Sequence, residues 1–376
     1  MFRNVFLAFL LVTLFSPFIS FAQAEETLMP ETGLEATTAP QDIHATVVSV
    51  EEESIVDGFP QIRFTAKDAQ GKTYEVDTRE SYTEGLRYRI KPGTNVLLQV
   101  LEGAEGEDRA FLADIDRTSS LVWLTLLFAG LVISVGYWRG LSALLGLGVT
   151  CAVLFGFVFR LILDGHDPVL VTVAGSMLIL GANMPLSHGW SRRTALSFLS
   201  TAAGLLLSLL VSWLFTFWAN LSGLASEESV FLFWNIGGAL NPQGLLLAAF
   251  ILGSVGVLDD IAIAQGEAVH EIRQANPSIS NRNLFGASLR LGRHHIASTV
   301  NTLVLAYVGS AMPLLLLFMT SKVGMVDFLN TELVAEEVVR TLAGTFALVA
   351  TVPIATALSV FGNSKTRLQL RNPDKE

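Results

Sequence analysis

Two adjacent acids, Asp259 and Asp260, lie inside the apolar run 244 to 263, which is long enough to span a membrane. A carboxylate in hydrocarbon is costly unless it faces protein, water or a partner, so an intramembrane acid is a candidate site. Small residues let a neighbouring helix approach closely. Acids on the same face would line any gap that opens between the two helices toward the end of the span. At about 100° per residue, one helix face carries three small residues and then three acids, Ala249, Gly253, Gly256, Asp260, Glu267 and Glu271.

A second apolar run begins near Ile296, where His294, Ser298 and Asn301 share a face, with Thr302 adjoining. If the two runs are antiparallel neighbours, Asp260 and Asn301 both lie about 5 to 7 Å inside the apolar boundary by helical rise. We therefore predict that these two residues are neighbours in a site for protons or cations. Asp260→Asn is expected to abolish activity, and Asp259→Asn to be milder because its side chain points about 100° away. The rival interpretation places both aspartates in the headgroup zone, where neither needs a partner.

Other chemistries find little support in the sequence. Glu267-x-x-His270 matches the Glu-x-x-His unit of carboxylate-bridged metal sites, but a solvated amphipathic extension of the helix explains it better. We therefore predict no metal and no cofactor. Intramembrane aspartyl proteolysis needs two aspartates from different spans, and no other predicted span carries one in its interior. A nucleotide-driven pump would need a phosphate-binding loop, which is absent, so the sequence does not predict an enzyme.

Composition places the chain among membrane proteins. Its 376 residues are 51% apolar, with a mean hydropathy of +0.52 and one cysteine, Cys151, which excludes a disulfide within the chain. The net charge of −10 arises in the N-terminal third, where 25 to 117 holds 20 acids and 9 bases. The sequence has no basic patch of the kind that binds nucleic acid. The apolar composition instead predicts the lipid bilayer as a partner.

The N-terminal third divides into three predicted segments. Residues 1 to 24 carry Arg3, an apolar stretch and Ala22-Gln23-Ala24, the pattern of a cleaved signal peptide, although an uncleaved anchor stays open. Residues 25 to 41 are polar without periodicity and predict a flexible tether. From 42 to 117, five short alternating runs predict a small barrel-like β domain with a structural or partner-binding role.

The remaining chain predicts an α-helical polytopic domain, 121 to 363, followed by a tail, 364 to 376. Cytoplasmic connections would hold eleven basic residues against one in the short outer loops, so we expect an inner-membrane protein with its β domain extracytoplasmic and its C-terminus cytoplasmic. Residues 230 to 243 suggest either a re-entrant half-helix or a kinked fifth span. The seven expected spans cover 121 to 138, 141 to 163, 168 to 186, 194 to 218, 244 to 263, 297 to 320 and 337 to 361.

Arg340 lies inside the last apolar run, near its outer end, and Glu336 precedes it by four residues. Arg160 and Asp164 show the same spacing in the second span. Pairing within the helix and extension of the long side chains toward water explain both arginines without a function.

GSVGVLDDIAIAQGEAVHEI and GRHHIASTVNTLVLAYVGSAMP resemble the signature stretches of the YibE/YibF family of bacterial multi-spanning proteins. That likeness places motif positions at Asp260, Glu271, Gly292, Arg293, Asn301 and Thr302. The strands around KPGTNVLLQV resemble the family's small extracytoplasmic domain. This chain departs at His294-His295, where the family pattern has an acid followed by an apolar residue. The resemblance implies the fold and transfers no activity.

Two classes of function follow from these patterns. The first is a secondary transporter or ion-coupled permease for an unknown small solute or ion, based on intramembrane acids, a broken helix and a polar cluster. The second is a non-transporting membrane factor whose outer β domain recruits an envelope protein. Dependence of the phenotype on Asp260 rather than on the β domain would favour transport.

Overall fold

A computed structural model describes residues 41–56, 59–78, 90–101, 109–238 and 240–362. The chain forms two compact units that divide in sequence between Tyr137 and Trp138. The predicted signal peptide and C-terminal tail, and all of the predicted tether except Gln41, lie outside the described residues.

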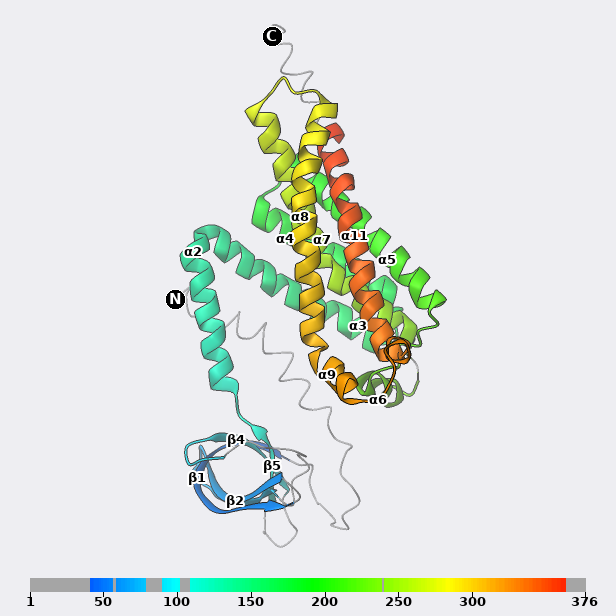
Figure 1. Cartoon of the computed structure of the whole chain (residues 1–376). Coiled ribbons are helices and arrows are strands. Elements are labelled where there is room, and N and C mark those ends of the chain that lie inside the picture. Colours follow the sequence, from blue (N-terminus) through cyan, green and yellow to red (C-terminus); the bar gives the residue numbers. More distant parts are fainter. Residues whose placement is uncertain (1–40, 57–58, 79–89, 102–108, 239, 363–376) are drawn as a thin grey trace. The chain divides into compact units, whose positions relative to one another are not determined.

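The first unit contains the predicted β domain as one antiparallel sheet with the strand order β3-β2-β1-β4-β5. Apolar and polar residues alternate along its strands, and every second side chain turns to one face of the sheet. The fully buried side chains on that face include Phe64, Val76, Val96 and Leu98. Two register shifts in β1 bend this long strand, and the sheet curls into a half-barrel (Figure 1). The strands are β1 (Gln41–Val56), β2 (Phe59–Asp68), β3 (Thr73–Asp77), β4 (Asn95–Leu101) and β5 (Arg109–Ile115).

The rest of the described chain is helical, as expected. The elements are α2 (Thr118–Val153), the π-helical turn η2 (Leu154–Val158), α3 (Phe159–Leu163), α4 (Pro168–His188), α5 (Arg192–Trp218), α6 (Glu227–Asn235), α7 (Pro242–Ala275), α8 (Asn281–Ser310), α9 (Met312–Thr320), α10 (Met325–Leu329) and α11 (Glu332–Gly362).

The number of spanning helices differs from the expected seven. Among the described residues, five helical runs are long and apolar enough to cross a membrane, or six if the bent pair α8 and α9 is counted as one. The first two predicted spans form one 46-residue run, Thr118–Leu163, without a loop. Tyr137 interrupts that run with non-helical backbone angles (φ 48°, ψ −127°). At about 1.5 Å per residue the run is about twice as long as a bilayer core is thick, so two crossings remain a prediction.

The sixth predicted span is not straight. α8 and α9 meet at 64° around Ala311. Pro313 lies in the first turn of α9, where its missing N–H and fixed φ suit a helix start but prevent continuation of α8. The segment 230 to 243 contains the short helix α6, then left-handed Gly237 and Gly238, before α7 begins at Pro242. The short helix α6 is therefore separate from α7.

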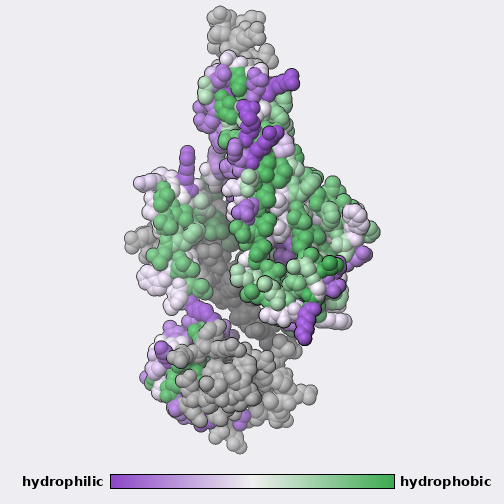
Figure 2. Space-filling view, viewed as in Figure 1, coloured by the Kyte–Doolittle hydropathy of each residue, from purple (hydrophilic) through white to green (hydrophobic). Residues whose placement is uncertain are grey.

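The polar connection expected between the fifth and sixth spans is mostly helical. Only residues 276 to 280 join α7 to α8. We call the end of the second unit that carries this connection the hairpin end, and the opposite end the far end. Arg273 donates to Asn281 Oδ1 (2.7 Å) and closes the connection. Hydrophilic residues cover the hairpin end, whereas apolar residues dominate the flank beyond it (Figure 2).

α5, α7 and α11 form the centre of the second unit, and their contacts fix their directions. Ser208 of α5 bonds to Ser254 of α7, and Ser197 donates to the carbonyl of Ala262, so α5 and α7 are antiparallel. Gln265 of α7 bonds to Thr356 of α11, and a Cβ at Gly344 would lie 3.4 Å from Ser254 Oγ. α7 and α11 are therefore parallel, as expected for two spans separated by one return crossing.

Candidate functional site

The face of α7 predicted to carry small residues and acids is exposed within the single chain. Ala249, Gly253, Gly256 and Asp260 are all exposed, as are Glu267 and Glu271 nearer the hairpin end. One side chain of α8 reaches this face: the Tyr307 hydroxyl lies 3.2 Å from the position of a Cβ at Gly253. The glycine thus allows α8 to pack close to α7.

The two adjacent aspartates occupy different surroundings. Asp260 is exposed, whereas Asp259 is half-buried, and its Oδ1 atom is enclosed without a hydrogen-bond partner among the described residues. Asp259 lies toward the interior because its neighbours on the helix surface, Val255 and Ala262, are both buried. By burial, Asp259 is therefore the stronger candidate, although the sequence favoured Asp260.

The partner face on α8 is also exposed. Its residues are His294, Ser298, Asn301 and Thr302, and Thr302 Oγ1 donates to the carbonyl of Ser298 (3.0 Å). In the described chain no hydrogen bond joins Asp260 to Asn301, so their proximity remains a prediction. α8 nevertheless runs beside α7 in the expected antiparallel direction, because Gln265 donates to the carbonyl of Ser288 (2.8 Å) at one end and Tyr307 lies against Gly253 at the other.

The glycine and arginine of the α8 motif have different roles in the packing. Gly292 is buried, and a Cβ there would lie 2.5 Å from Val352 Cγ1 and 2.9 Å from Gln265 Oε1. Glycine is therefore required for α8 to contact α7 and α11 together. Arg293 is exposed.

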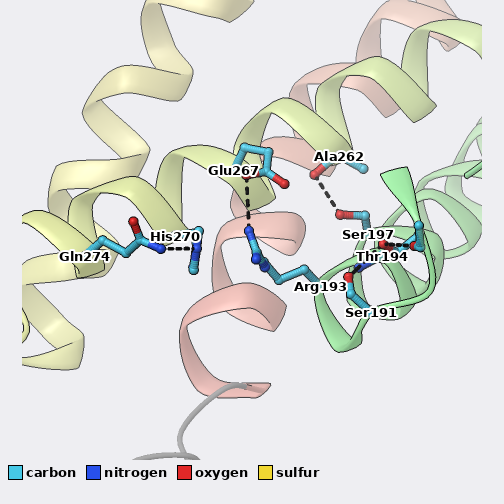
Figure 3. Close-up of polar contacts among 9 residues, drawn as sticks. Ser191, Arg193, Thr194, Ser197, Ala262, Glu267, His270 and Gln274 are labelled. Carbon is cyan, nitrogen blue, oxygen red and sulfur yellow. Dashed lines mark hydrogen bonds and ion pairs between the residues drawn. The ribbon is translucent and has the colours of Figure 1, made fainter. Parts of the chain in front are cut away.

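Glu267 and His270 have different partners in the structure. Glu267 forms an ion pair with Arg193 of α5 (3.4 Å), and His270 bonds to Gln274 one turn along α7 (2.6 Å), as Figure 3 shows. Within the described chain, no group of three or more His, Cys, Asp or Glu residues could hold a metal ion.

A polar seam runs through the interior of the second unit, and the sequence reasoning overlooked it. Seven buried small or hydroxyl residues recur every three or four positions along α5: Thr194, Ser197, Thr201, Gly204, Ser208, Ser212 and Thr216. This spacing places them on one helix face, so the signal was present in the sequence. The seam continues onto α7 and α11 through Ser254, Gln265 and Thr356.

Several hydroxyls in this interior have no hydrogen-bond partner in the described part of the chain. Ser212 Oγ and Thr216 Oγ1 of α5, and Thr172 Oγ1 and Ser176 Oγ of α4, are buried and unpaired. Buried polar groups normally pair with protein or water. Near the hairpin end, by contrast, Gln265 pairs with both α8 and α11.

Arg340 pairs differently from the sequence expectation. Its guanidinium binds Glu337 (2.6 Å) and lies over the Phe250 ring (5.4 Å). Glu336 receives no such contact; it is buried, with 8% of its surface exposed, and its Oε1 atom has no hydrogen-bond partner among the described residues. A carboxylate that the sequence treated as a structural partner is therefore available for other chemistry.

In the described chain, five or six apolar helices long enough to cross a bilayer, together with an N-terminal curled sheet, indicate a membrane protein with an N-terminal β domain. Residues 124–365 match the family of YibE/F-like proteins, and since the match covers more than half of the chain, the protein belongs to that family. Neither the curated proteins nor the solved structures include a match to this chain.

Proposed function

We propose that this protein is a secondary transporter or ion-coupled permease of the bacterial inner membrane, with its β domain outside and its C-terminus in the cytoplasm. The observation that carries the proposal is the polar seam among apolar helices, with buried unpaired hydroxyls and the enclosed Oδ1 of Asp259. Polar groups inside spanning helices are costly, and they mark the paths of ions and solutes.

The proposed route passes through the interior of the bundle. Asp259 is half-buried beside that interior, whereas Asp260 is exposed. We therefore assign the coupling carboxyl to Asp259, with Asp260 next to it. This assignment reverses the order expected from the sequence, because a helix with apolar residues on all sides does not reveal from its pattern which side faces the bundle.

The test uses full-length protein in vesicles that contain a pH-sensitive dye. A pH gradient is imposed in the presence of a panel of small solutes and cations. Wild-type protein should dissipate the gradient with at least one solute or cation. Asp259→Asn should abolish this flux, and Asp260→Asn should reduce it less. Glu267→Gln is the matched control, because Glu267 is exposed on the same helix and, among the described residues, pairs with half-buried Arg193.

Two results would argue against the proposal. Absence of flux in wild-type protein across the panel would reject transport under these conditions. If deletion of 42 to 117 then abolished a cellular phenotype that Asp259→Asn leaves intact, the outer β domain would be the functional part. The protein would then be a membrane factor that recruits an envelope partner.

A further inference from the structure

We propose that Glu336 is a proton-binding carboxyl at the far end of the second unit. The first three turns of α11 hold Glu332, Glu336, Glu337 and Arg340, so acids exceed bases by two. Three of these four side chains have partners: Glu332 accepts the backbone N–H of Ser222, and Glu337 pairs with Arg340. Glu336 is the buried member whose Oε1 atom has none among the described residues.

The surroundings of Glu336 favour a neutral acid. Its neighbours in the helix, Ala335 and Val339, pack against Leu221, Leu246 and Phe250. A carboxylate enclosed by apolar groups without a donor is costly, whereas the protonated acid is much less so. Arg340 offsets part of that charge, but among the described residues its guanidinium donates to Glu337 through Nη1 and makes no hydrogen bond to Glu336, and its buried Nε has no partner.

The helices around this group add few charges. The far-end half of α7, 242 to 258, and the stretch of α5 from 197 to 218 contain no titratable residue. α8 contributes the Tyr307 hydroxyl, which interacts electrostatically with Arg340 and Glu337, and neighbouring α10 carries Asp327. The charges that act on Glu336 itself come from Glu332, Glu337 and Arg340.

The number of ligands points to a proton rather than a metal ion. Calcium, magnesium and similar cations need several oxygen ligands around one point. In the described chain no set of three or more acidic, His or Cys side chains offers such a site. One enclosed carboxyl oxygen is sufficient for a proton.

The position of Glu336 complements that of Asp259. Since Gly344 of α11 lies level with Ser254 of α7, the two carboxyls are separated by about 20 Å along the bundle by helical rise. Ser208 and Ser212 of the polar seam lie between these levels. Glu336 would then be the entry site for a coupling proton at the far end; this role rests on the proposed function, whereas proton binding itself does not.

Infrared spectroscopy of the full chain in lipid nanodiscs tests the inference. Protonated carboxyl groups absorb separately from carboxylates, and a pH titration follows their number. Wild-type protein should show a protonated-carboxyl component at neutral pH that is lost in Glu336→Gln. The control Glu228→Gln should retain it, because Glu228 is exposed in the first turn of α6.

Identical spectra for wild type and Glu336→Gln would overturn the inference. If Glu336→Gln does not fold, Glu336→Asp replaces it, and an unchanged frequency of the protonated component would have the same meaning. Vesicle flux separates the two proposals. If the protonated component is lost in Glu336→Gln but wild-type protein shows no flux, the proton-binding site would stand and the transport proposal would fail.

Discussion

Glycines at the helix contacts determine how closely the central helices of the second unit approach. A Cβ at Gly204 of α5 would collide with Thr351 Oγ1 of α11 and lie 3.4 Å from Leu258 Cδ2 of α7. A Cβ at Gly256, on the exposed face of α7, would meet nothing within 4 Å. Alanine substitution at these two positions therefore separates the effect of overpacking a helix contact from the effect of replacing a glycine within a helix.

Gly204→Ala should destabilise the protein, because the added methyl group overpacks the contact between three helices, at a cost of about 1 to 3 kcal/mol. The melting temperature in detergent measures the effect. Gly256→Ala is the control and should melt at or slightly above wild type, since alanine favours a helix over glycine. Equal melting of the two variants would show that the α5 contact is not tight.

Asp116 links the β domain to the start of α2. Its Oδ1 atom accepts the N–H of Thr118 (2.8 Å), and its Oδ2 atom lies 3.0 Å from His44 Nδ1. Burial raises the pKa of this carboxyl, but the bonds from Thr118 and the contact with His44 outweigh burial, and its pKa is lowered overall. Because the folded pKa lies below the unfolded one, the stabilising contribution exists above the unfolded value and disappears as pH falls through the folded value.

Asp116→Asn should therefore destabilise the β domain at neutral pH by about 1 kcal/mol, the usual net value of a hydrogen bond. The difference from wild type should shrink below pH about 4, where the carboxyl becomes protonated. Hydrogen exchange of the β4 and β5 amides in the full chain measures the effect. A difference that is independent of pH would exclude the charge as its origin.

At the scale of elements, the curled sheet buries its own apolar face. All buried members of its core, from Ala45 to Leu112, belong to the β domain. Residues 42 to 117, expressed alone, should therefore give a β-type circular dichroism spectrum and one cooperative melt. A random-coil spectrum would mean that the fold needs the helical part of the chain or a partner.

The same scale shows why some helix boundaries differed from expectation. Hydropathy ends a span where polar residues begin, yet α7 continues to Ala275 and α8 starts at Asn281, because helical hydrogen bonds do not require an apolar surface. Ser280 accepts the N–H of Asn283 and caps α8. The bend before α9 was foreseeable from Pro313, since proline marks a helix start.

For the whole molecule, topology is the central prediction. Helix α5 runs antiparallel to α7 and α11, and the basic residues concentrate in the predicted cytoplasmic connections. With Cys151 replaced by serine, single cysteines at Gly106 and Ser226 should react with an impermeant reagent from outside. A cysteine at Ser280, in the connection between α7 and α8, should not. Labelling of position 280 from outside would contradict the seven-span arrangement.

The sequence by itself determined the kinds of element and the family. Alternation predicted the five strands, because a sheet with one buried face needs apolar residues at every second position. Long apolar runs predicted the helical region, because each span must satisfy its backbone internally and cover it with apolar side chains. The stretches around Asp260 and Asn301 indicated the YibE/F-like family, which the match over residues 124–365 confirms.

Only the tertiary structure decided which side chains face one another. It turned Asp259 rather than Asp260 toward the interior, and it paired Arg340 with Glu337 rather than Glu336. It also gathered the hydroxyl groups of α5 into one buried seam. The physical reason is that a helix meant for a bilayer is apolar on its lipid side and on its packed side, so hydrophobic periodicity cannot tell the two apart.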